Sequence, residues 1–212
     1  MIYKGSEKQK DIYKGSTKIG KVYKGSTLVY QSKIPAGQVI FSSNNPGTYT
    51  ITITSKQNYY IELVGGGAGA FAYLSSNNRG GGSGACIYGT ILLDKGIYTL
   101  VIGSGTAGVI GPNSYDVSDA GSTTFLNNIA GGGLGHSQIH PSETYLGGIA
   151  TVTSSGLSGI NGNNTITGTT NGGYSVYDNT ATGYGAGGFI YDAGGIWAPT
   201  NGQNGFARII TA

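Results

Sequence analysis

Two stretches of the chain match nucleotide-binding motifs in their letters but lack the surroundings that such sites need. Residues 103–108 follow Gly-x-Gly-x-x-Gly, the turn whose backbone approaches a dinucleotide pyrophosphate. A true site continues into a helix, and Gly111 and Pro112 interrupt any helix here. Residues 15–21 almost spell a phosphate-binding loop, but Val22 stands where a hydroxyl must hold magnesium. We therefore expect no cofactor.

Two groups of polar residues have the residue types of a metal site without its spacing. His136, His140 and Glu143 lie near Pro141 in a predicted loop. The four-residue spacing of the two histidines would place them on one face of a helix, but in a loop it does not bring the three side chains together. A second group lacks the spacing of a calcium-binding loop and comprises Asn113, Asp116 and Asp119. We predict no metal site at either place.

The side chains that catalysis needs are scarce. Both histidines share one loop and the nine carboxylates are scattered, so no nucleophile, base and orienting acid come together. The single cysteine, Cys86, lies in a predicted strand, where a buried apolar role is the common one. We predict that the protein is not an enzyme. A glycan depolymerase needs only two carboxylates and stays a weaker alternative.

Aromatic residues of the last third form the best candidate for a binding site. They are interleaved with glycine, asparagine and serine, the mixture that makes antibody loops adaptable binders. Such rings stack on sugars or pack on protein epitopes. In the other interpretation they cover a glycine-rich body that has little other apolar surface. The candidate ligand-binding residues are Tyr174, Tyr177, Tyr184, Tyr191 and Trp197.

The first thirty residues repeat a ten-residue unit three times. Ile-Tyr-Lys-Gly-Ser begins at residues 2 and 12, and Val-Tyr-Lys-Gly-Ser begins at residue 22. Each copy places a β-branched residue and a tyrosine before a turn, which predicts a strand, a tight turn and a return strand. Because so small a unit cannot bury a face alone, we predict a β-meander that oligomerises.

Residues 1–33 form a basic arm, and residues 34–212 form a slightly acidic body. Eight lysines against Glu7 and Asp11 give the arm a charge of +6, whereas four cations against seven acids give the body −3. In one interpretation, the lysines protect exposed strand edges from aggregation. In a second, they dock the arm on the acidic surface of a partner protein, and binding of the arm to nucleic acid is the weakest alternative. In the docking interpretation, the anchoring residues are Tyr3, Lys4, Tyr13, Lys14, Tyr23 and Lys24.

The body is predicted to be all-β. Of the 212 residues 41 are glycine, and no stretch places apolar residues at helical spacing over three turns, so we expect almost no α-helix. Tyr49, Ile51 and Ile53 share one face of a strand whose other face is threonine, a pattern typical of an antiparallel sheet on a core. The predicted strands are residues 39–41, 49–54, 59–64, 85–93, 97–102, 123–127 and 206–211.

Glycine clusters lie between these strands, at residues 65–69, 80–84 and 131–135 and in shorter runs as far as 195. Flexible linkers do not usually recur as short clusters between strong strands. The alternative is packed left-handed helices of the polyproline II type, in which glycine lets backbones approach closely. Because the clusters are short, we expect only a few such segments.

Several motifs combine a strand with a glycine run, at residues 61–67, 80–85, 96–103, 121–125 with 130–133, and 204–209. Together they resemble the glycine-rich domain of bacteriophage tail-fibre and adhesin proteins, over roughly residues 38–212. The Tyr-Lys-Gly-Ser repeats are similar to N-terminal modules of virion proteins. The resemblance implies an antiparallel jelly-roll-like sandwich with inserted glycine-rich segments and exposed loops.

From this resemblance we expect a structural protein of the virion surface, a fibre or adhesin subunit that presents a host-binding domain. We expect assembly in the host cytoplasm, because residues 1–10 do not contain the apolar core of a signal peptide. Expected partners are further copies of the chain, other virion proteins at the arm, and a host surface glycan or protein, but neither nucleic acid nor membrane. The alternative is a head fibre or capsid-decoration protein without a receptor role.

Self-association is directly testable. The repeats cannot bury a face alone, and proteins of the resembled kind commonly assemble three chains, so we expect a homotrimer. Light scattering at micromolar concentration should give three times the mass of the chain. A monomer with the arm intact contradicts this expectation.

Overall fold

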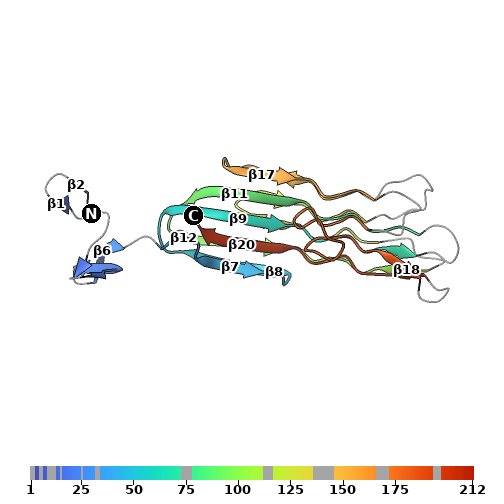
Figure 1. Cartoon of the computed structure of the whole chain (residues 1–212), viewed down its shortest axis with the longest axis horizontal. Coiled ribbons are helices and arrows are strands. Elements are labelled where there is room, and N and C mark those ends of the chain that lie inside the picture. Colours follow the sequence, from blue (N-terminus) through green and yellow to red (C-terminus); the bar gives the residue numbers. More distant parts are fainter. Residues whose placement is uncertain are drawn as a thin grey trace.

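The computed structural model describes residues 3–4, 7–8, 13–14, 16–24, 26–31, 34–72, 78–111, 117–135, 146–165, 172–192 and 197–212. Within these ranges every regular element is a strand, and none is a helix that could span a membrane. The prediction of an all-β fold is therefore confirmed. Figure 1 shows an elongated molecule whose N-terminal strands stand apart from the body at one end.

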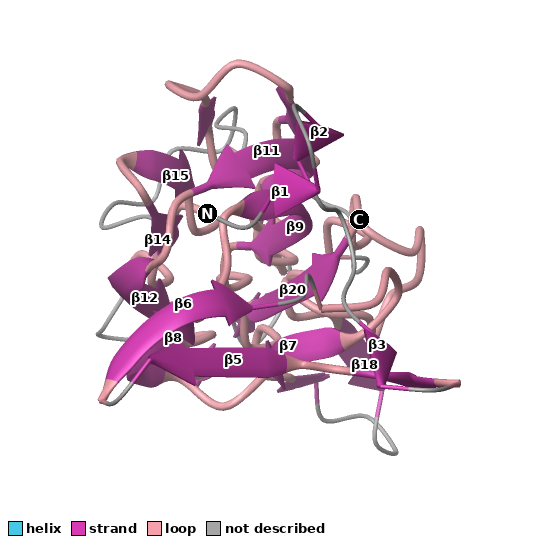
Figure 2. Cartoon of the chain, turned by 90° about the vertical axis from the view of Figure 1, so that its left-hand side faces the viewer, coloured by secondary structure: helices cyan, strands magenta, loops and turns pink. Residues whose placement is uncertain are grey.

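Two five-stranded antiparallel sheets form the part of the body next to these N-terminal strands (Figure 1). One has the order β17-β11-β9-β20-β7 and the other β16-β15-β14-β12-β8. Seen along the long axis, the two sheets face each other as a sandwich (Figure 2). Their strands are β7 (Val39–Ser43), β8 (Gly47–Ile53), β9 (Gln57–Val64), β11 (Cys86–Leu93), β12 (Gly96–Ile102), β14 (Thr123–Phe125), β15 (Asn128–Ala130), β16 (Ala150–Thr151), β17 (Leu157–Ile160) and β20 (Phe206–Thr211).

The core lies between the sheets and follows the alternation of the sequence. On β8, Ile51 and Ile53 are buried while the alternating Thr50 and Thr52 are exposed, as predicted. On β9, Tyr59, Ile61 and Leu63 are fully buried against them. Other members of the same cluster are Ile87, Ile91, Leu93, Leu100, Ile102, Phe125, Ala130, Ala207 and Ile209. The sandwich prediction is thus confirmed, together with the predicted buried face of β8.

One boundary prediction, the strand at residues 123–127, needs correction. β14 ends at Phe125, and Leu126 and Asn127 form a turn with φ of 52° and 62° that leads into β15. Two consecutive residues with positive φ match the twist of a tight hairpin. The buried amide of Asn128 supports the turn by donating to Phe125 O at 3.0 Å. β15 was not predicted, because only Ile129 shows the preference of a strand.

Beyond the sandwich, the glycine-rich segments form a bundle held by backbone hydrogen bonds. The amides of residues 65–70 donate to different neighbours in turn, and for two of the three directions the same neighbouring segment recurs after three residues. Amides 65 and 68 donate to segment 82–85, amides 67 and 70 to segment 200–203, and amides 66 and 69 to Gly121 and Thr106. Three residues per turn without internal hydrogen bonds define the polyproline II helix, so the predicted conformation is confirmed.

The bundle is larger than the few segments that we expected from the short clusters. Successive segments exchange hydrogen bonds throughout the body, and serine, alanine, threonine and asparagine occupy positions between the glycines. The segments that take part are residues 64–72, 79–85, 103–110, 117–122, 131–135, 146–149, 161–165, 172–175, 184–189 and 199–205. Two short pairs lie among them, β10 (Phe71–Ala72) with β13 (Val109–Ile110) and β18 (Ile190–Asp192) with β19 (Trp197–Pro199).

Glycine is required where neighbouring backbones touch. A Cβ at Gly81 would lie within 3.0 Å of the carbonyl of Ala68, and a Cβ at Gly67 within 3.0 Å of the carbonyl of Ala186. Backbone atoms cannot move aside as the end of a flexible side chain can. The high glycine content therefore reflects packing rather than flexibility.

The N-terminal repeats form three hairpins, as the strand–turn–strand pattern predicts. The pairs are β1 (Tyr3–Lys4) with β2 (Glu7–Lys8), β3 (Tyr13–Lys14) with β4 (Thr17–Lys18), and β5 (Lys21–Lys24) with β6 (Thr27–Gln31). Among the described residues these are three separate two-stranded sheets and not one continuous meander. Strands of two residues offer too few ladder hydrogen bonds to join the next repeat.

The packing of the bundle predicts that an alanine substitution lowers stability at one glycine and has little effect at another. Gly81→Ala should lower the free energy of unfolding by about 3 kcal/mol or more, because the new methyl group overlaps the backbone of residue 68. Gly96→Ala is the matched control, since its Cβ would come no closer than 3.5 Å to the ring of Tyr98. Urea unfolding of both variants measures the difference, and equal midpoints would contradict the packing argument.

Candidate functional site

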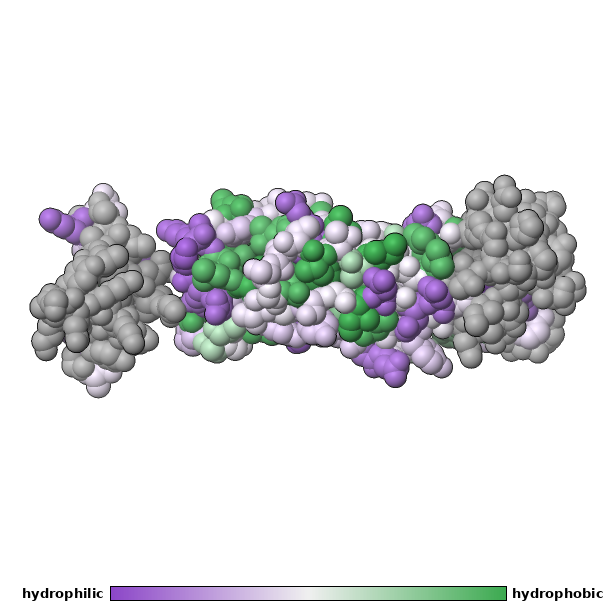
Figure 3. Space-filling model, turned by 90° about the horizontal axis from the view of Figure 1, so that it is seen from above, coloured by the Kyte–Doolittle hydropathy of each residue, from purple (hydrophilic) through white to green (hydrophobic). Residues whose placement is uncertain are grey.

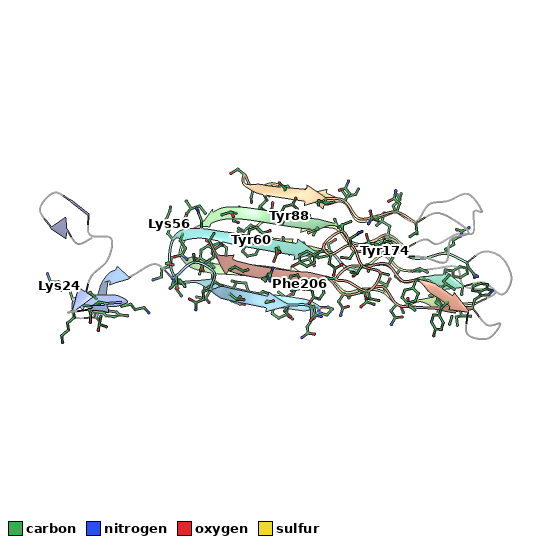
Figure 4. All side chains as sticks on the ribbon, viewed as in Figure 1. Lys24, Lys56, Tyr60, Tyr88, Tyr174 and Phe206 are labelled. Atoms are coloured by element: carbon green, nitrogen blue, oxygen red, sulfur yellow. The ribbon has the colours of Figure 1, made fainter. Side chains whose placement is uncertain are left out.

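The five candidate aromatic residues do not form one site. Tyr177 and Tyr184 pack on Phe206 beside the sandwich, whereas Tyr191 and Trp197 belong to the β18–β19 hairpin at the other end of the body. Tyr174 is 47% exposed and lies on the bundle (Figure 4). The structure therefore separates a sandwich-side group from a hairpin group.

Tyr184 and Tyr177 are held in place by ring contacts. The ring of Tyr184 is stacked on Phe206, with centroids 4.4 Å apart and planes 6° from parallel. Tyr177 is tilted against both rings, with centroids 5.6 Å from Phe206 and 6.0 Å from Tyr184. The three rings cover Val64 and Cys86. Tyr177 and Tyr184 therefore cover apolar residues of the body, as in the second interpretation of the aromatic candidates. The ring of Tyr184 also borders the groove described below.

An ion pair fixes Tyr177 to the outer face of the β9–β20 sheet. Arg208 Nε donates to the buried carboxylate of Glu62, and the Tyr177 hydroxyl donates to its other oxygen at 3.3 Å. Hydrogen bonding to Glu62 raises the pKa of Arg208. Burial, and then the negative charge of Glu62, raises the pKa of Tyr177. Both oxygens of Glu62 thus have partners, which makes it an anchor for the loop and not a free base.

Cys86 lies under this anchor and is chemically quiet. Its side chain is buried, as predicted, and burial with the nearby negative charge of Glu62 raises its pKa to about 12. At neutral pH the thiolate fraction is on the order of 10⁻⁵, so the thiol is not a ready nucleophile.

A polar groove opens beside Tyr184. It has a volume of about 420 Å³ and lies between the β7–β8 turn, the loop of residues 178–183 and two segments of the bundle. Its lining combines amides, hydroxyls, one carboxylate and one aromatic ring, from Asn44, Asp178, Thr180, Thr182, Gly183, Tyr184, Gln203 and Asn204. We call this feature the Tyr184 groove.

Hydrogen bonds hold the walls of the Tyr184 groove together. Gly185 N donates to Asn204 O at 2.9 Å, and Gln203 N donates to Ala186 O at 2.8 Å, which joins the two bundle segments. The carboxylate of Asp178 accepts from both the amide and the hydroxyl of Thr180, at 3.1 and 2.9 Å. The groove is therefore formed before any ligand arrives.

The β7–β8 turn is also tied down. The Tyr49 hydroxyl donates to Asn45 O at 2.8 Å, and Asn45 N donates to the Ser43 hydroxyl at 3.1 Å. These bonds place the exposed side chain of Asn44 at the rim of the groove. In the described part of the chain, no three metal-ligating side chains gather in a cluster.

A family model described as a glycine-rich domain matches residues 42–208, which is most of the chain. The chain belongs to this glycine-rich domain family. No curated protein matches the chain. The matched span of the glycine-rich domain runs from β7 into β20 and includes the Tyr184 groove, whereas the hairpins of the arm lie before it.

The β18–β19 hairpin places the other aromatic candidates of the glycine-rich domain. Trp197 packs on Ala70, Ala72 and Ile190 and is half-buried. Tyr191 is 50% exposed, with its ring centroid 6.4 Å from that of Phe189. Trp197 thus covers the bundle, while Tyr191 and Tyr174 remain available on its surface.

The arm residues lie in the hairpins before the glycine-rich domain. Tyr3, Lys4 and Tyr13 have strand backbone, and their side chains lie outside the described part. Lys14 and Lys24 are exposed, and Tyr23 is 55% exposed. Figure 4 shows Lys24 far from the bundle. The arm candidates and the aromatic candidates are therefore separate in space.

The nucleotide-like motif at residues 103–108 is a bundle segment of the glycine-rich domain. Its amides are used internally: Gly103 N donates to Thr123 Oγ1 at 3.1 Å and Thr106 N to Gly67 O at 3.2 Å. Asp119 accepts from Gly135 N at 2.8 Å. The other proposed ligands fall outside the described residues, namely Asn113, Asp116, His136, His140 and Glu143.

Sequence reasoning missed most of the Tyr184 groove. Asp178, Thr180 and Thr182 lie close together along the chain, and their run of small polar residues before Tyr184 was a usable signal. Asn44 comes from a turn more than 130 residues away, so only the fold brings it there.

Two ion pairs among the described residues of the body, Arg208–Glu62 and Lys56–Asp94, should differ in their contribution to stability. Arg208→Met leaves the buried Glu62 without its cation and should lower the free energy of unfolding by about 2–3 kcal/mol. This value is at the low end for a broken buried ion pair, because the Arg208 side chain is 36% exposed. Lys56→Met is the control, because Lys56 and Asp94 are both largely exposed and such a pair contributes less than about 1 kcal/mol. Thermal unfolding at pH 7 gives both values. Equal losses would contradict the anchoring role of Glu62.

Proposed function

We propose that the protein is a structural subunit of a bacteriophage virion surface, a fibre or adhesin that presents its glycine-rich domain for host recognition. The observation that carries this proposal is the elongated body with a separate basic arm at one end (Figure 1). A protein with this layout can attach at one end and display at the other. The family membership fits such a role.

The construction of the body supports use outside a cell. In the bundle, backbone amides donate to neighbouring segments, so few of these N–H groups are left to form hydrogen bonds with water or denaturant. The chain has one cysteine and so reaches this rigidity without an internal disulfide. A display domain that must keep its shape in a varied environment benefits from both properties.

The arm supports attachment to other virion proteins. It concentrates a charge of +6 in 33 residues and places Lys14, Lys24 and Tyr23 on exposed hairpins. An acidic surface on a partner would complement these lysines. Protection of strand edges by the same lysines is compatible with this role.

Self-association has support from one side of the body. Residues 146–177 contain no charged side chain, and Ile149 and Ile160 there are 65% and 42% exposed. Figure 3, which views the body from above, shows apolar residues in separate patches among polar ones. An open, uncharged edge suits contact with further copies of the chain in a trimer.

We further propose that the protein acts by binding and not by catalysis. The carboxylate of Glu62 has partners on both oxygens, and the thiol of Cys86 has a pKa of about 12. Asp178 is the one carboxylate that lines the Tyr184 groove, where a glycosidase of the usual kind needs a pair.

Gold-labelled antibodies against the glycine-rich domain should bind purified phage particles at projecting fibres in electron micrographs. A second measurement uses particles whose subunit begins at Ile34, so that the arm is absent and the contacts of Ile34 and Gly37 with the body are kept. These particles should lack the label, while the truncated protein still folds.

Adsorption to host cells separates the display role from its alternatives. Antibodies that cover the domain should slow adsorption at least tenfold. Label on the capsid with unchanged adsorption would instead identify a decoration protein. Release of sugars from host polysaccharide by the purified protein would identify a depolymerase.

A further inference from the structure

We propose that the Tyr184 groove binds one or two neutral sugar residues of a surface polysaccharide. This proposal rests on the proposed function for its biological setting, and it names the chemical class of the ligand. Apart from Tyr184, the residues of the groove were not among the candidates from the sequence. The volume of about 420 Å³ lies within the roughly 300–1,000 Å³ of small-molecule sites.

The lining matches a ligand rich in hydroxyl groups. Asn44 and Gln203 each carry an amide that both donates and accepts, and Thr182 adds a hydroxyl. The Asn204 amide offers its N–H donors, because its Oδ1 already accepts from Gly105 N at 3.1 Å. The Thr180 hydroxyl offers its acceptor, because it donates to Asp178. A sugar hydroxyl also donates and accepts, so each pair can satisfy both partners. The carboxylate of Asp178 adds one strong acceptor for such hydroxyls.

The charge of the lining excludes acidic ligands. None of the lining residues is a lysine, arginine or histidine, and Asp178 contributes a negative charge. A phosphate or carboxylate in the groove would meet this charge with no cation to offset it. Neutral sugars are therefore favoured over sugar phosphates and uronic acids.

Tyr184 supplies a rigid ring at the wall of the groove. Stacking on Phe206 fixes its orientation, so that little side-chain freedom is lost when a ligand packs against it. The C–H groups of a sugar ring form an apolar face that packs on such an aromatic surface. The ring and the amides thus address the two kinds of surface that a sugar presents.

Gly183 lets the carboxylate of Asp178 lie close to the chain. A Cβ at Gly183 would come within 3.0 Å of the Asp178 carboxylate oxygens, and these are the end of an exposed side chain that can move. Gly183→Ala should therefore displace this carboxylate without unfolding the body. It is a mild change that acts on the groove alone.

Nuclear magnetic resonance of the full chain, labelled with ¹⁵N, tests the proposal with glucose, galactose, mannose and N-acetylglucosamine at up to 50 mM. At least one sugar should shift the amides of Thr180, Gly183 and Asn204 with a Kd in the millimolar range. Glucose 6-phosphate should bind at least tenfold more weakly than glucose. Another cavity, lined by residues that include Lys56 and Asn58, is an internal control whose amides should not move.

Three variants of exposed or partly exposed positions complete the test. Thr182→Arg, which fills the groove, and Gly183→Ala should each weaken sugar binding at least tenfold. Ile97→Ala, at a position on β12 that is 76% exposed and does not line the groove, should leave sugar binding unchanged. The spectrum outside the groove reports that each variant is folded.

Binding of none of the four sugars, equal binding by Thr182→Arg, or tighter binding of glucose 6-phosphate would each overturn the proposal. These results are independent of the virion assignment. Sugar binding by a protein that is absent from particles would refute only the virion role, whereas a particle-bound protein that ignores all four sugars would refute only the groove.

Discussion

Direct contact between neighbouring backbones is the constraint on which the body of this protein depends. In the bundle the carbonyl of one segment occupies the place where a side chain of the next segment would stand, as between Ala68 and Gly81. The contact removes the side chain and also aligns an amide with a carbonyl. Burial of apolar side chains, the usual source of cohesion, has a smaller part here, because the apolar clusters outside the sandwich are small.

The sandwich and the bundle are continuous pieces of the same segments. β9 runs directly into residues 65–70, β12 into residues 103–108, and residues 199–205 run into β20. The register of the strands, which their buried side chains fix, therefore also sets which residues of neighbouring bundle segments lie opposite each other. Hydrogen bonds such as Gly67 N to Gln203 O join residues far apart in sequence, so the bundle depends on long-range contacts just as the sheets do.

The sequence is informative where local pattern and tertiary role coincide. Alternation at Tyr49, Ile51 and Ile53 marks a buried face, and the glycine runs mark close approach, so the sandwich and the polyproline II segments were predictable. The extent of the bundle was not, because a threonine or serine between glycines looks the same in a loop.

Predictability falls further at the candidate site. Five aromatic residues suggested one surface, yet Phe206, which belongs to a strand, draws Tyr177 and Tyr184 to the sandwich, while hairpin pairing draws Tyr191 and Trp197 away. Asn44 reaches the groove from the β7–β8 turn. Such meetings depend on long-range packing, which composition and spacing do not record.

The three-residue repeat of the bundle also restricts how such a domain can change in length during evolution. Adding one residue inside residues 65–70 would rotate every following amide by about 120° and direct it to the wrong neighbour. Adding three would restore the directions and lengthen the segment by roughly 9 Å. Insertions and deletions that relatives tolerate within the bundle should therefore come in multiples of three, whereas the turns that join its segments are free of that rule.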